Sequence, residues 1–255
     1  MAKVQNLETV EAVEHFTDDL FWFRTTKKGE WARPFRPGEF VMIGMGDDNT
    51  TRAYSIANSP DDDGIEFFSI KVQDGPLTSR LQHIKKGDTL DISTRPIGTL
   101  ILTNLNMYNL DHDKPRLWCI STGTGLAPFL SIARHPEAYE YYDQVIITHT
   151  CRTNDELVFR TELESHGAVV YQTVTREEPA DGVFTGRITD NINTGKLFTD
   201  LNCDEFDPTR DRIMICGGPS FNNEIRAMLE ARGWEHGTMK SPGHFVQERA
   251  FVETL

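Results

Sequence analysis

Short apolar strands alternate with helical segments in the second half of the chain, and this alternation limits the possible folds more than any other feature. The strands read RLWCI, QVIITHTC, AVVYQTVT and RIMICG, and segments such as APFLSIARH, NDELVFRTELESHG and SFNNEIRAMLEARG have a helical period. Such an alternation predicts a parallel sheet with helices on both faces, because each helix returns the chain to the starting edge. We therefore predict an α/β, Rossmann-like domain over residues 105–255.

The first half of the chain has a different sequence pattern. The segments FWFRTT, GEFVMIGM, RAYSIA, IEFFSIKV and TLDIST are rich in aromatic and β-branched residues, and Gly, Pro, Asp and Asn separate them. One segment differs, because Leu77, Leu81 and Ile84 fall at helical spacing before Gly87. We predict an antiparallel β-barrel with a helical plug over residues 1–104, followed by a boundary in the turn-rich LNMYNLDHDKP.

Composition and charge exclude several classes of protein. The chain of 255 residues is 38% hydrophobic and 25% charged, which is ordinary for a globular protein. A net charge of −13 argues against a nucleic-acid partner, because phosphate binding needs a basic face. The chain has no apolar run of membrane-spanning length and no signal peptide at its start, so we expect no membrane association and a cytoplasmic location.

The four cysteines lie far apart, and no C-x-x-C pair occurs. That spacing excludes a zinc ribbon and a cysteine-bound iron–sulfur cluster, and it favours free thiols in a reducing compartment. His149 and Cys151 lie two residues apart on one strand face, but the pattern offers no third ligand. We therefore expect no metal site.

The segment STGTGLAPFLSI follows the strand that ends at Ile120. Two glycines spaced by one residue allow a sharp turn, and the following helix directs its free N–H groups and positive dipole end toward that turn. This arrangement favours a pyrophosphate, although a simple strand-to-helix turn remains an alternative. No Gly-Lys-Ser/Thr follows, so the loop is not a Walker loop.

Arginines follow the next strands where NAD-specific folds carry an acid. Arg152 ends the second strand, Arg176 ends the third, and Arg187 follows in TGRI. Three arginines at this edge can hold a 2′-phosphate with charge-assisted hydrogen bonds, which favours NADP(H) over NAD(H). The alternative is three surface arginines, with Glu177 and Glu178 as partners of Arg176.

The fourth strand ends in ICGGPSF, which places Cys216 where a strand residue would meet a nicotinamide. Gly217 and Gly218 then form a turn that allows close approach. The alternative is a buried structural thiol, and no activating base is evident in the sequence.

The tetrapeptide RAYS raises a separate question, because Arg52 and Tyr54 share one face of a strand while Ser55 lies on the other or at its end. Tyr54 could stack on an isoalloxazine, Arg52 could neutralise a pyrophosphate, and Ser55 could bind the edge of the flavin. A core tyrosine beside an edge arginine is the alternative interpretation.

The motifs RAYSIANSP, EFFSIKVQDGPLTSRL, STGTGLAPFLSI, TREE…GRI, CGGPSF and ERAFVETL occur together in this order. In this, the chain resembles the bacterial ferredoxin (flavodoxin)–NADP⁺ reductases over almost its whole length. The resemblance implies an N-terminal FAD-binding barrel, a C-terminal NADP(H)-binding domain and hydride transfer where they meet. It also implies ferredoxin or flavodoxin as the electron carrier and, by analogy, a monomer.

The resemblance further implies site residues. The implied FAD contacts are Arg52, Ala53, Tyr54, Ser55, Ile70, Val72, Leu77, Thr78, Ser79, Thr124, Ala250 and Phe251. The implied NADP(H) contacts are Arg152, Thr175, Arg176, Arg187, Gly217 and Gly218. The implied catalytic residues are Tyr54, Ser55, Cys216, Ala250 and Glu253. In this arrangement Phe251 stacks on the adenine of FAD, whereas the ending Thr254–Leu255 departs from the family pattern and weakens the assignment of Glu253.

Two alternatives remain: the same chain serving an oxygenase or free flavin, and a non-catalytic redox sensor. The sequence shows no output element for a sensor, such as a DNA-binding helix pair or a reactive cysteine pair. Ferredoxins and flavodoxins are acidic and would be repelled by an acidic surface, so we expect a local basic patch where the carrier binds. The candidates are Lys27, Lys28, Arg33 and Arg36, or Lys85 and Lys86.

Overall fold

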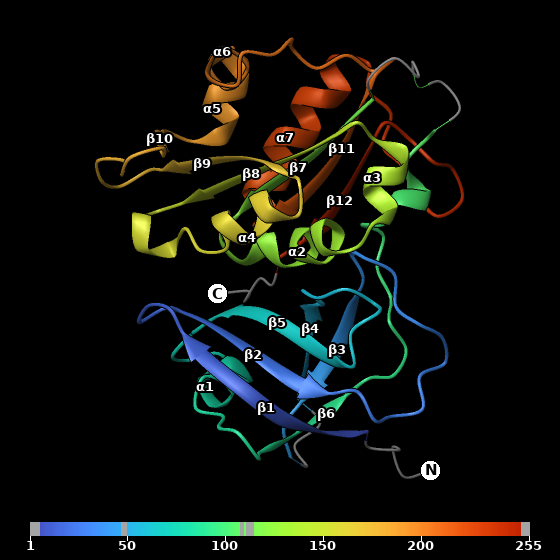
Figure 1. The fold of residues 1–255 in the computed structure, drawn as a ribbon, viewed down its shortest axis with the longest axis vertical. Coiled ribbons are helices and arrows are strands. Elements are labelled where there is room, and N and C mark those ends of the chain that lie inside the picture. The colour runs from blue at the N-terminus through green and yellow to red at the C-terminus, as the bar shows by residue number, and fades with distance from the viewer. Residues whose placement is uncertain (1–5, 47–49, 108–109, 111–114, 251–255) are drawn as a thin grey trace.

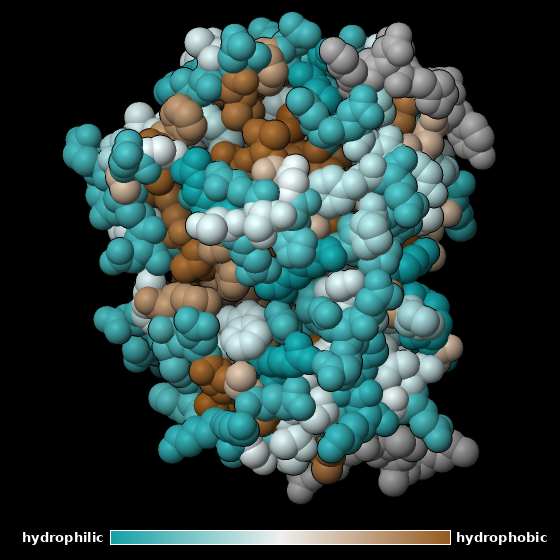
Figure 2. All heavy atoms as spheres, viewed as in Figure 1, coloured by the Kyte–Doolittle hydropathy of each residue, from teal (hydrophilic) through white to brown (hydrophobic). Residues whose placement is uncertain are grey.

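The computed structural model describes residues 6–46, 50–107, 110 and 115–250. It has two lobes, with the barrel formed by the first part of the chain and an α/β layer structure formed by the second (Figure 1). Figure 2 shows a mostly hydrophilic surface on this side, with apolar residues visible in the hollow where the lobes meet.

The first lobe is a six-stranded antiparallel sheet in the order β4-β3-β6-β1-β2-β5. Its strands are β1 (Leu7–His15), β2 (Leu20–Thr26), β3 (Phe40–Gly44), β4 (Thr51–Ser55), β5 (Gly64–Ile70) and β6 (Thr89–Ile92). The amide of Ala57, just after β4, donates to the carbonyl of Glu66 on β5 at 2.8 Å, so the two end strands meet and the sheet curls into a barrel. The predicted antiparallel barrel is confirmed.

The predicted helical plug is shorter than the spacing of its apolar residues indicates. Helix α1 spans only Thr78–Leu81, although Leu77, Leu81 and Ile84 are all buried in the barrel core.

Strand β1 was not among the predicted strands, because a charged residue takes one of its inward positions. Glu8 is 1% exposed, and its carboxylate accepts hydrogen bonds from Thr26 Oγ1 at 2.5 Å, Lys28 N at 2.9 Å and Gly29 N at 2.7 Å. A carboxylate is tolerated inside a sheet lobe only when such donors satisfy it. These donors come from β2 and its following turn, so only the tertiary structure reveals the strand.

The second lobe is a six-stranded sheet in the order β10-β9-β8-β7-β11-β12, and every pairing is parallel. Its strands are β7 (Arg116–Thr122), β8 (Gln144–Cys151), β9 (Val169–Val174), β10 (Phe184–Thr185), β11 (Asp211–Gly217) and β12 (Phe245–Arg249). On the face toward the barrel lie α2 (Ala127–Arg134), α3 (Glu137–Tyr141) and α4 (Arg160–Ser165) (Figure 1). On the opposite face lie α5 (Ile188–Asn193), α6 (Lys196–Asp200) and α7 (Pro219–Ala231). Short 3-10 turns are η1 (Leu102–Asn104), η2 (Gly123–Leu126) and η3 (Asn154–Glu156).

Both faces of the parallel sheet are buried, which explains why its strands read as continuous apolar runs. Along β7, Leu117 and Cys119 belong to the core under α2, while Trp118 and Ile120 belong to the core under α5 to α7. The predicted parallel sheet with helices on both faces is confirmed.

The segment NDELVFRTELESHG is not the single helix that its period predicts. Phe159 has φ 69° and separates η3 from α4. Its ring packs edge-on against Phe16 and Phe68 of the barrel, each with ring centroids at 5.4 Å. Aromatic contacts of this kind stabilise a pair beyond simple burial, and we attribute the left-handed backbone to them.

The two lobes share one continuous core, in which Leu20 and Phe68 of the barrel pack with Phe129 and Leu130 of α2. Arg134, at the end of α2, reinforces the contact. Its Nη1 donates to the Ala57 carbonyl at 2.8 Å and to Glu66 at 2.7 Å, and its Nε donates to Glu162 at 2.6 Å. Helix α2 is thus fixed to the barrel wall at its C-terminal end.

Among the described residues, no helix is both long enough and apolar enough to cross a membrane. The placement of the domain boundary between residues 104 and 105 remains a prediction.

Candidate active site

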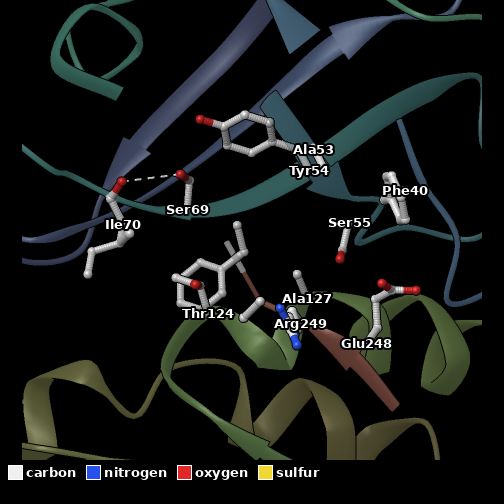
Figure 3. A pocket seen from close by; sticks show the side chains of 12 residues that line it. Phe40, Ala53, Tyr54, Ser55, Ser69, Ile70, Thr124, Ala127, Glu248 and Arg249 are labelled. Atoms are coloured by element: carbon white, nitrogen blue, oxygen red, sulfur yellow. Dashed lines mark hydrogen bonds between the residues drawn. The ribbon is translucent and has the colours of Figure 1, made fainter. Parts of the chain in front are cut away.

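A narrow pocket of about 80 Å³ lies where the lobes meet, and we call it the junction pocket (Figure 3). Its lining residues are Phe40, Ala53, Tyr54, Ser55, Phe68, Ser69, Ile70, Thr124, Ala127, Glu248, Arg249 and Ala250. Strands β4 and β5 of the barrel form one wall, while η2, the start of α2 and the end of β12 form the other.

The barrel fixes the position of the tyrosine in this pocket. Tyr54 is 6% exposed, and its ring packs edge-to-face on Phe67 with centroids at 6.3 Å. Ser55 follows at the end of β4 and points into the space between the walls, opposite Glu248 (Figure 3). An aromatic ring beside hydroxyl groups and strand backbone matches the chemistry of a flat heteroaromatic ring with polar edges. The donor set therefore fits a flavin.

Other residues predicted to contact FAD line neither this pocket nor the larger cavity described below. Arg52 lies half-buried on β4, and its Nη1 donates to the Thr51 carbonyl at 2.9 Å. Val72 precedes the turn before α1 and Ser79 lies within α1, and Thr78 Oγ1 donates to the Val72 carbonyl at 3.2 Å. Leu77 is fully buried in the barrel core. Phe251 and Glu253 lie outside the described residues.

A second, larger cavity of about 700 Å³ opens at the carboxyl ends of the parallel strands, and we call it the arginine cavity. Segments after all six strands of the second lobe contribute to it, and Asp19, Leu20 and Ile70 reach it from the barrel. The second-lobe residues are Thr122, Gly123, Thr124, Thr150, Cys151, Arg152, Glu156, Thr175, Arg176, Arg187, Ile188, Thr189, Gly218, Phe221 and Ala250.

The two cavities meet, because Ile70, Thr124 and Ala250 line both of them. The ends of parallel strands are the usual ligand edge of an α/β sheet, and here this edge faces the tyrosine wall of the barrel. A ligand in one cavity would therefore contact a ligand in the other.

The predicted arginines converge on the arginine cavity. Arg152 and Arg176 are exposed, and the Arg176 amide donates to the Arg152 carbonyl at 3.0 Å, which holds the ends of β8 and β9 together. Arg187 is already paired, since its Nη2 lies 2.6 Å from Glu224. Glu177 is not engaged with Arg176 but accepts a hydrogen bond from the side chain of Asn154 at 2.5 Å. The cationic edge that the sequence predicted is therefore present.

The two glycines of the STGTG turn have different structural roles. Gly123 has φ +51°, and a side chain there would meet nothing within 4 Å. At Gly125 an added Cβ would lie 2.1 Å from the Cys216 carbonyl oxygen, so this glycine is needed for packing against β11 rather than against a ligand. Gly123 is therefore the glycine on the cavity side.

The three residues of the CGG motif lie in different surroundings. Cys216 is fully buried among apolar side chains and lines neither cavity, and burial raises the pKa of its thiol well above the usual range. Gly217 is packed tightly, because an added Cβ would lie 2.3 Å from the ring of Phe221. Gly218 lines the arginine cavity. The burial of Cys216 matches the alternative of a structural thiol.

Glu248 lines the junction pocket, although the sequence pattern pointed to Glu253 instead. Its carboxylate accepts from Thr99 N at 3.0 Å and Thr99 Oγ1 at 3.1 Å. It lies on β12, a strand that was not predicted and that pairs with β11 opposite Cys216. Glu248 opens the motif ERAFVETL, but the motif does not indicate its position, which the pairing of β12 with β11 reveals.

Two family models match the chain. An oxidoreductase FAD-binding domain matches residues 7–101, and an oxidoreductase NAD-binding domain matches residues 119–227. The FAD-binding match covers the barrel strands, and the NAD-binding match covers most of the parallel sheet and its arginine cavity.

Similar proteins agree along the whole chain. A flavodoxin/ferredoxin–NADP reductase of Rhodobacter capsulatus is 46% identical over 96% of this chain and 93% of the relative. A ferredoxin–NADP reductase of Azotobacter vinelandii is 41% identical over 97% of this chain and 98% of the relative. The structure of a ferredoxin NADP⁺ reductase from Neisseria gonorrhoeae with bound FAD and NADP superposes with a TM-score of 0.86, at 26% identity over 96% of this chain and 98% of that one.

The predicted fold, family, cofactor classes and enzyme type are thereby confirmed. The tyrosine wall, the arginine cavity and their shared edge occur in a chain with the FAD-binding and NAD-binding domains of one enzyme family. This chain belongs to the ferredoxin/flavodoxin–NADP reductases, a family of FAD- and NADP-binding oxidoreductases.

Proposed function

We propose that this chain exchanges hydride with NADP(H) at FAD and exchanges single electrons with a ferredoxin or flavodoxin. The observation that carries the proposal is the shared edge of the two cavities at Ile70, Thr124 and Ala250. When bound, FAD supplies the conversion between two-electron and one-electron chemistry. The work of the protein is to orient the two cofactors and to exclude water between them.

On the barrel side, we assign the ring-binding role to Tyr54 and the role of binding the flavin edge to Ser55. Tyr54 is held by Phe67 from behind, so its ring is pre-positioned for a flat partner. Arg52 is the candidate for the pyrophosphate of FAD, because within the described part of the chain its guanidinium makes a single hydrogen bond, to the Thr51 carbonyl. Leu77, Thr78 and Ser79 are proposed as a second anion contact.

On the nucleotide side, we assign the 2′-phosphate to Arg152, Arg176 and Arg187. All three line one cavity of about 700 Å³, which supports binding of a single phosphate by several guanidinium groups. Thr175 and Gly218 line the same cavity and are proposed as further contacts. Gly217 is proposed to contribute through its tight packing behind Gly218.

The partner is an acidic electron carrier in this proposal, and the candidate docking cations differ in availability. Arg33 and Arg36 both bind the buried Glu39, at 2.6 and 2.8 Å. Lys85 and Lys86 are exposed. We therefore favour Lys85 and Lys86 over the arginine pair as contacts for a carrier.

We further propose that the protein is a monomer in the cytoplasm. All four cysteines are free thiols, three of them buried, which fits a reducing compartment. Size-exclusion chromatography with light scattering tests the oligomeric state.

The first experiment is an absorbance spectrum of the purified protein, followed by anaerobic additions of NADPH and NADH to separate samples. We expect a flavin spectrum that NADPH bleaches much faster than NADH, with Arg176→Ala narrowing that difference. Equal bleaching by both nucleotides would overturn the 2′-phosphate assignment, and a protein that binds no added FAD would overturn the function.

The electron carrier is tested separately by cytochrome c reduction with NADPH. We expect added ferredoxin or flavodoxin to accelerate the reaction, and the double variant Lys85→Gln/Lys86→Gln to weaken that acceleration. A rate that neither carrier changes, together with fast reduction of free flavin, would favour the alternative of a reductase for free flavin or an oxygenase.

A further inference from the structure

A buried imidazole lies directly below the floor of the arginine cavity. His149 on β8 is fully buried, and its Nε2 lies 3.0 Å from the carbonyl oxygen of Gly123 and 3.2 Å from Sγ of Cys151. Gly123 and Cys151 both line the cavity, but His149 does not. The imidazole therefore contacts the glycine turn from the side opposite to a ligand.

This geometry fixes which ring nitrogen carries the proton. Burial lowers the pKa of His149 to about 4, so the ring is neutral near pH 7 and has one N–H group. A carbonyl oxygen only accepts hydrogen bonds, so the contact with Gly123 requires the proton on Nε2. The thiol of Cys151 can donate instead to the Glu156 carbonyl, which lies at 3.6 Å.

A metal site does not explain why His149 and Cys151 lie side by side. Within the described ranges, no group of three or more His, Cys, Asp or Glu side chains that could hold a metal ion exists. The Nδ1 atom of His149 has no hydrogen-bond partner among those residues. The polar contacts of the ring within the described residues are those of Nε2 with the Gly123 carbonyl and the Cys151 thiol.

The bond controls the direction of one peptide group. In a trans peptide the C=O and the following N–H point in opposite directions, and no peptide in the described chain is cis. Holding the Gly123 carbonyl down on His149 therefore directs the Thr124 N–H up, toward the cavity that both residues line. Gly123 begins η2, so the turn constrains this peptide from one side, and the contact with His149 adds a donor from the strand below.

We propose that His149 is a positioning residue that locks the Gly123–Thr124 peptide with its N–H toward the arginine cavity and thereby strengthens binding of a dinucleotide pyrophosphate. The ligand class rests on the proposed function, whereas the lock itself rests on the geometry of His149. Oriented backbone N–H groups at the start of a helix are strong ligands for phosphate oxygens, and α2 begins three residues after Thr124.

The test compares three substitutions. His149→Gln keeps an N–H donor near the place of Nε2, His149→Asn keeps a donor only at the shorter reach of Nδ1, and His149→Leu removes every donor. The matched control is Thr148→Val, because Thr148 is also fully buried and immediately precedes His149 on β8. Each protein is titrated with NADP⁺ and with 2′-AMP, which carries the 2′-phosphate but no pyrophosphate.

We expect His149→Leu and His149→Asn to weaken NADP⁺ binding by about 10- to 100-fold, as for a hydrogen bond to a charged group. We expect their 2′-AMP affinity and FAD content to equal those of the wild type, and we expect His149→Gln to recover most of the NADP⁺ affinity. Equal weakening toward both ligands, or the same loss in Thr148→Val, would overturn the proposal in favour of general support of the fold. Unchanged NADP⁺ binding in all variants would also overturn it.

Nitrogen-15 NMR of the histidine rings separates this proposal from the proposed function. The lock requires a neutral His149 ring protonated on Nε2 between about pH 5 and 8, even in a protein without nucleotide. A ring protonated on Nδ1, or a charged ring, would overturn the lock. A wild-type protein that binds no NADP⁺ but has the expected ring would instead contradict the proposed function alone.

Discussion

The two cavities of the site differ in their chemistry. The junction pocket, of about 80 Å³, contains the buried Tyr54 of the barrel wall, whereas the arginine cavity, of about 700 Å³, is edged by exposed arginines. A flat neutral ring is recognised by packing, so its wall must be rigid and dry. A phosphate is recognised by charge, so its wall can remain open and solvated. Packing is therefore concentrated at the junction pocket, and exposed charge at the arginine cavity.

A third region connects the two walls. Helix α2 begins at the glycine turn of the nucleotide side, and Arg134 at its other end binds Ala57 and Glu66 of the barrel. We call this link, from the glycine turn through α2 to the Arg134 contacts, the clamp.

The largest expected effect is therefore the loss of this clamp. Replacing Arg134 with Met removes the cation that Glu66 and Glu162 share, although Glu66 keeps its pair with Arg24 at 3.1 Å. We expect a loss of about 3 kcal/mol of unfolding free energy, the lower end of the cost of breaking a buried pair. Urea denaturation measures the change, and stopped-flow hydride transfer shows whether the two walls have separated. Arg226→Met is the control, because its pair with Glu230 is exposed and contributes less than about 1 kcal/mol. Equal losses in the two variants would contradict the role of the clamp.

A smaller effect is expected on the charged wall alone. Arg176→Ala should raise the KM for NADPH by about 10- to 150-fold through the loss of one charge-assisted bond, and it should leave the KM for NADH unchanged. Arg187→Ala should cost less, because Glu224 already offsets part of the Arg187 charge at 2.6 Å. Steady-state kinetics with both nucleotides measure the two variants. A larger loss for Arg187 than for Arg176 would reverse our ranking of the two.

On the packed wall, Tyr54→Leu should weaken FAD binding by about 1–3 kcal/mol, the usual contribution of an aromatic stack on a base. Tyr54→Phe keeps the ring and is the matched control, so its FAD affinity should stay close to that of the wild type. Flavin fluorescence on titration into the apoprotein measures both. High salt should leave the difference in FAD affinity between Tyr54→Leu and the wild type nearly unchanged, because the stacking contact carries no charge, whereas it should weaken NADPH binding. A difference that falls strongly with salt would contradict packing as the role of Tyr54.

The smallest expected effect is a gain. Glu224→Gln releases Arg187 from its ion pair, which should tighten NADPH binding by about 0.2–1 kcal/mol. Isothermal titration with NADP⁺ at low salt measures it. Weaker NADP⁺ binding would mean that Glu224 contributes more by positioning the Arg187 side chain than it costs by offsetting the Arg187 charge.

Some site residues could be predicted because the local pattern carries their chemistry. The three arginines were found because strand ends in a parallel sheet meet at one edge, so residues far apart in sequence reach one cavity. For other residues the local pattern did not indicate where the side chain would lie. Glu248 is one acid among several near the end of the chain, and only the pairing of β12 with β11 brings it to the junction pocket.

Burial also changed several interpretations. Cys216 has the expected position along β11, yet its side chain faces the core rather than a cavity. Arg33 and Arg36 read as free cations in a turn, but both bind the carboxylate of Glu39, which is fully buried and has a lowered pKa because burial is outweighed by these partners. Local patterns give the type of a side chain and not its partner, so partners at long range escape them.

The sequence by itself determined the two-domain fold, the order of the motifs, the family and the arginines, because periodicity and turn residues act locally and repeat along the chain. Only the tertiary structure decided that the cavities share an edge at Ile70, Thr124 and Ala250, and that His149 lies under the glycine turn. These contacts join residues separated by up to most of the chain length. Their geometry depends on how the two lobes pack, which no local pattern encodes.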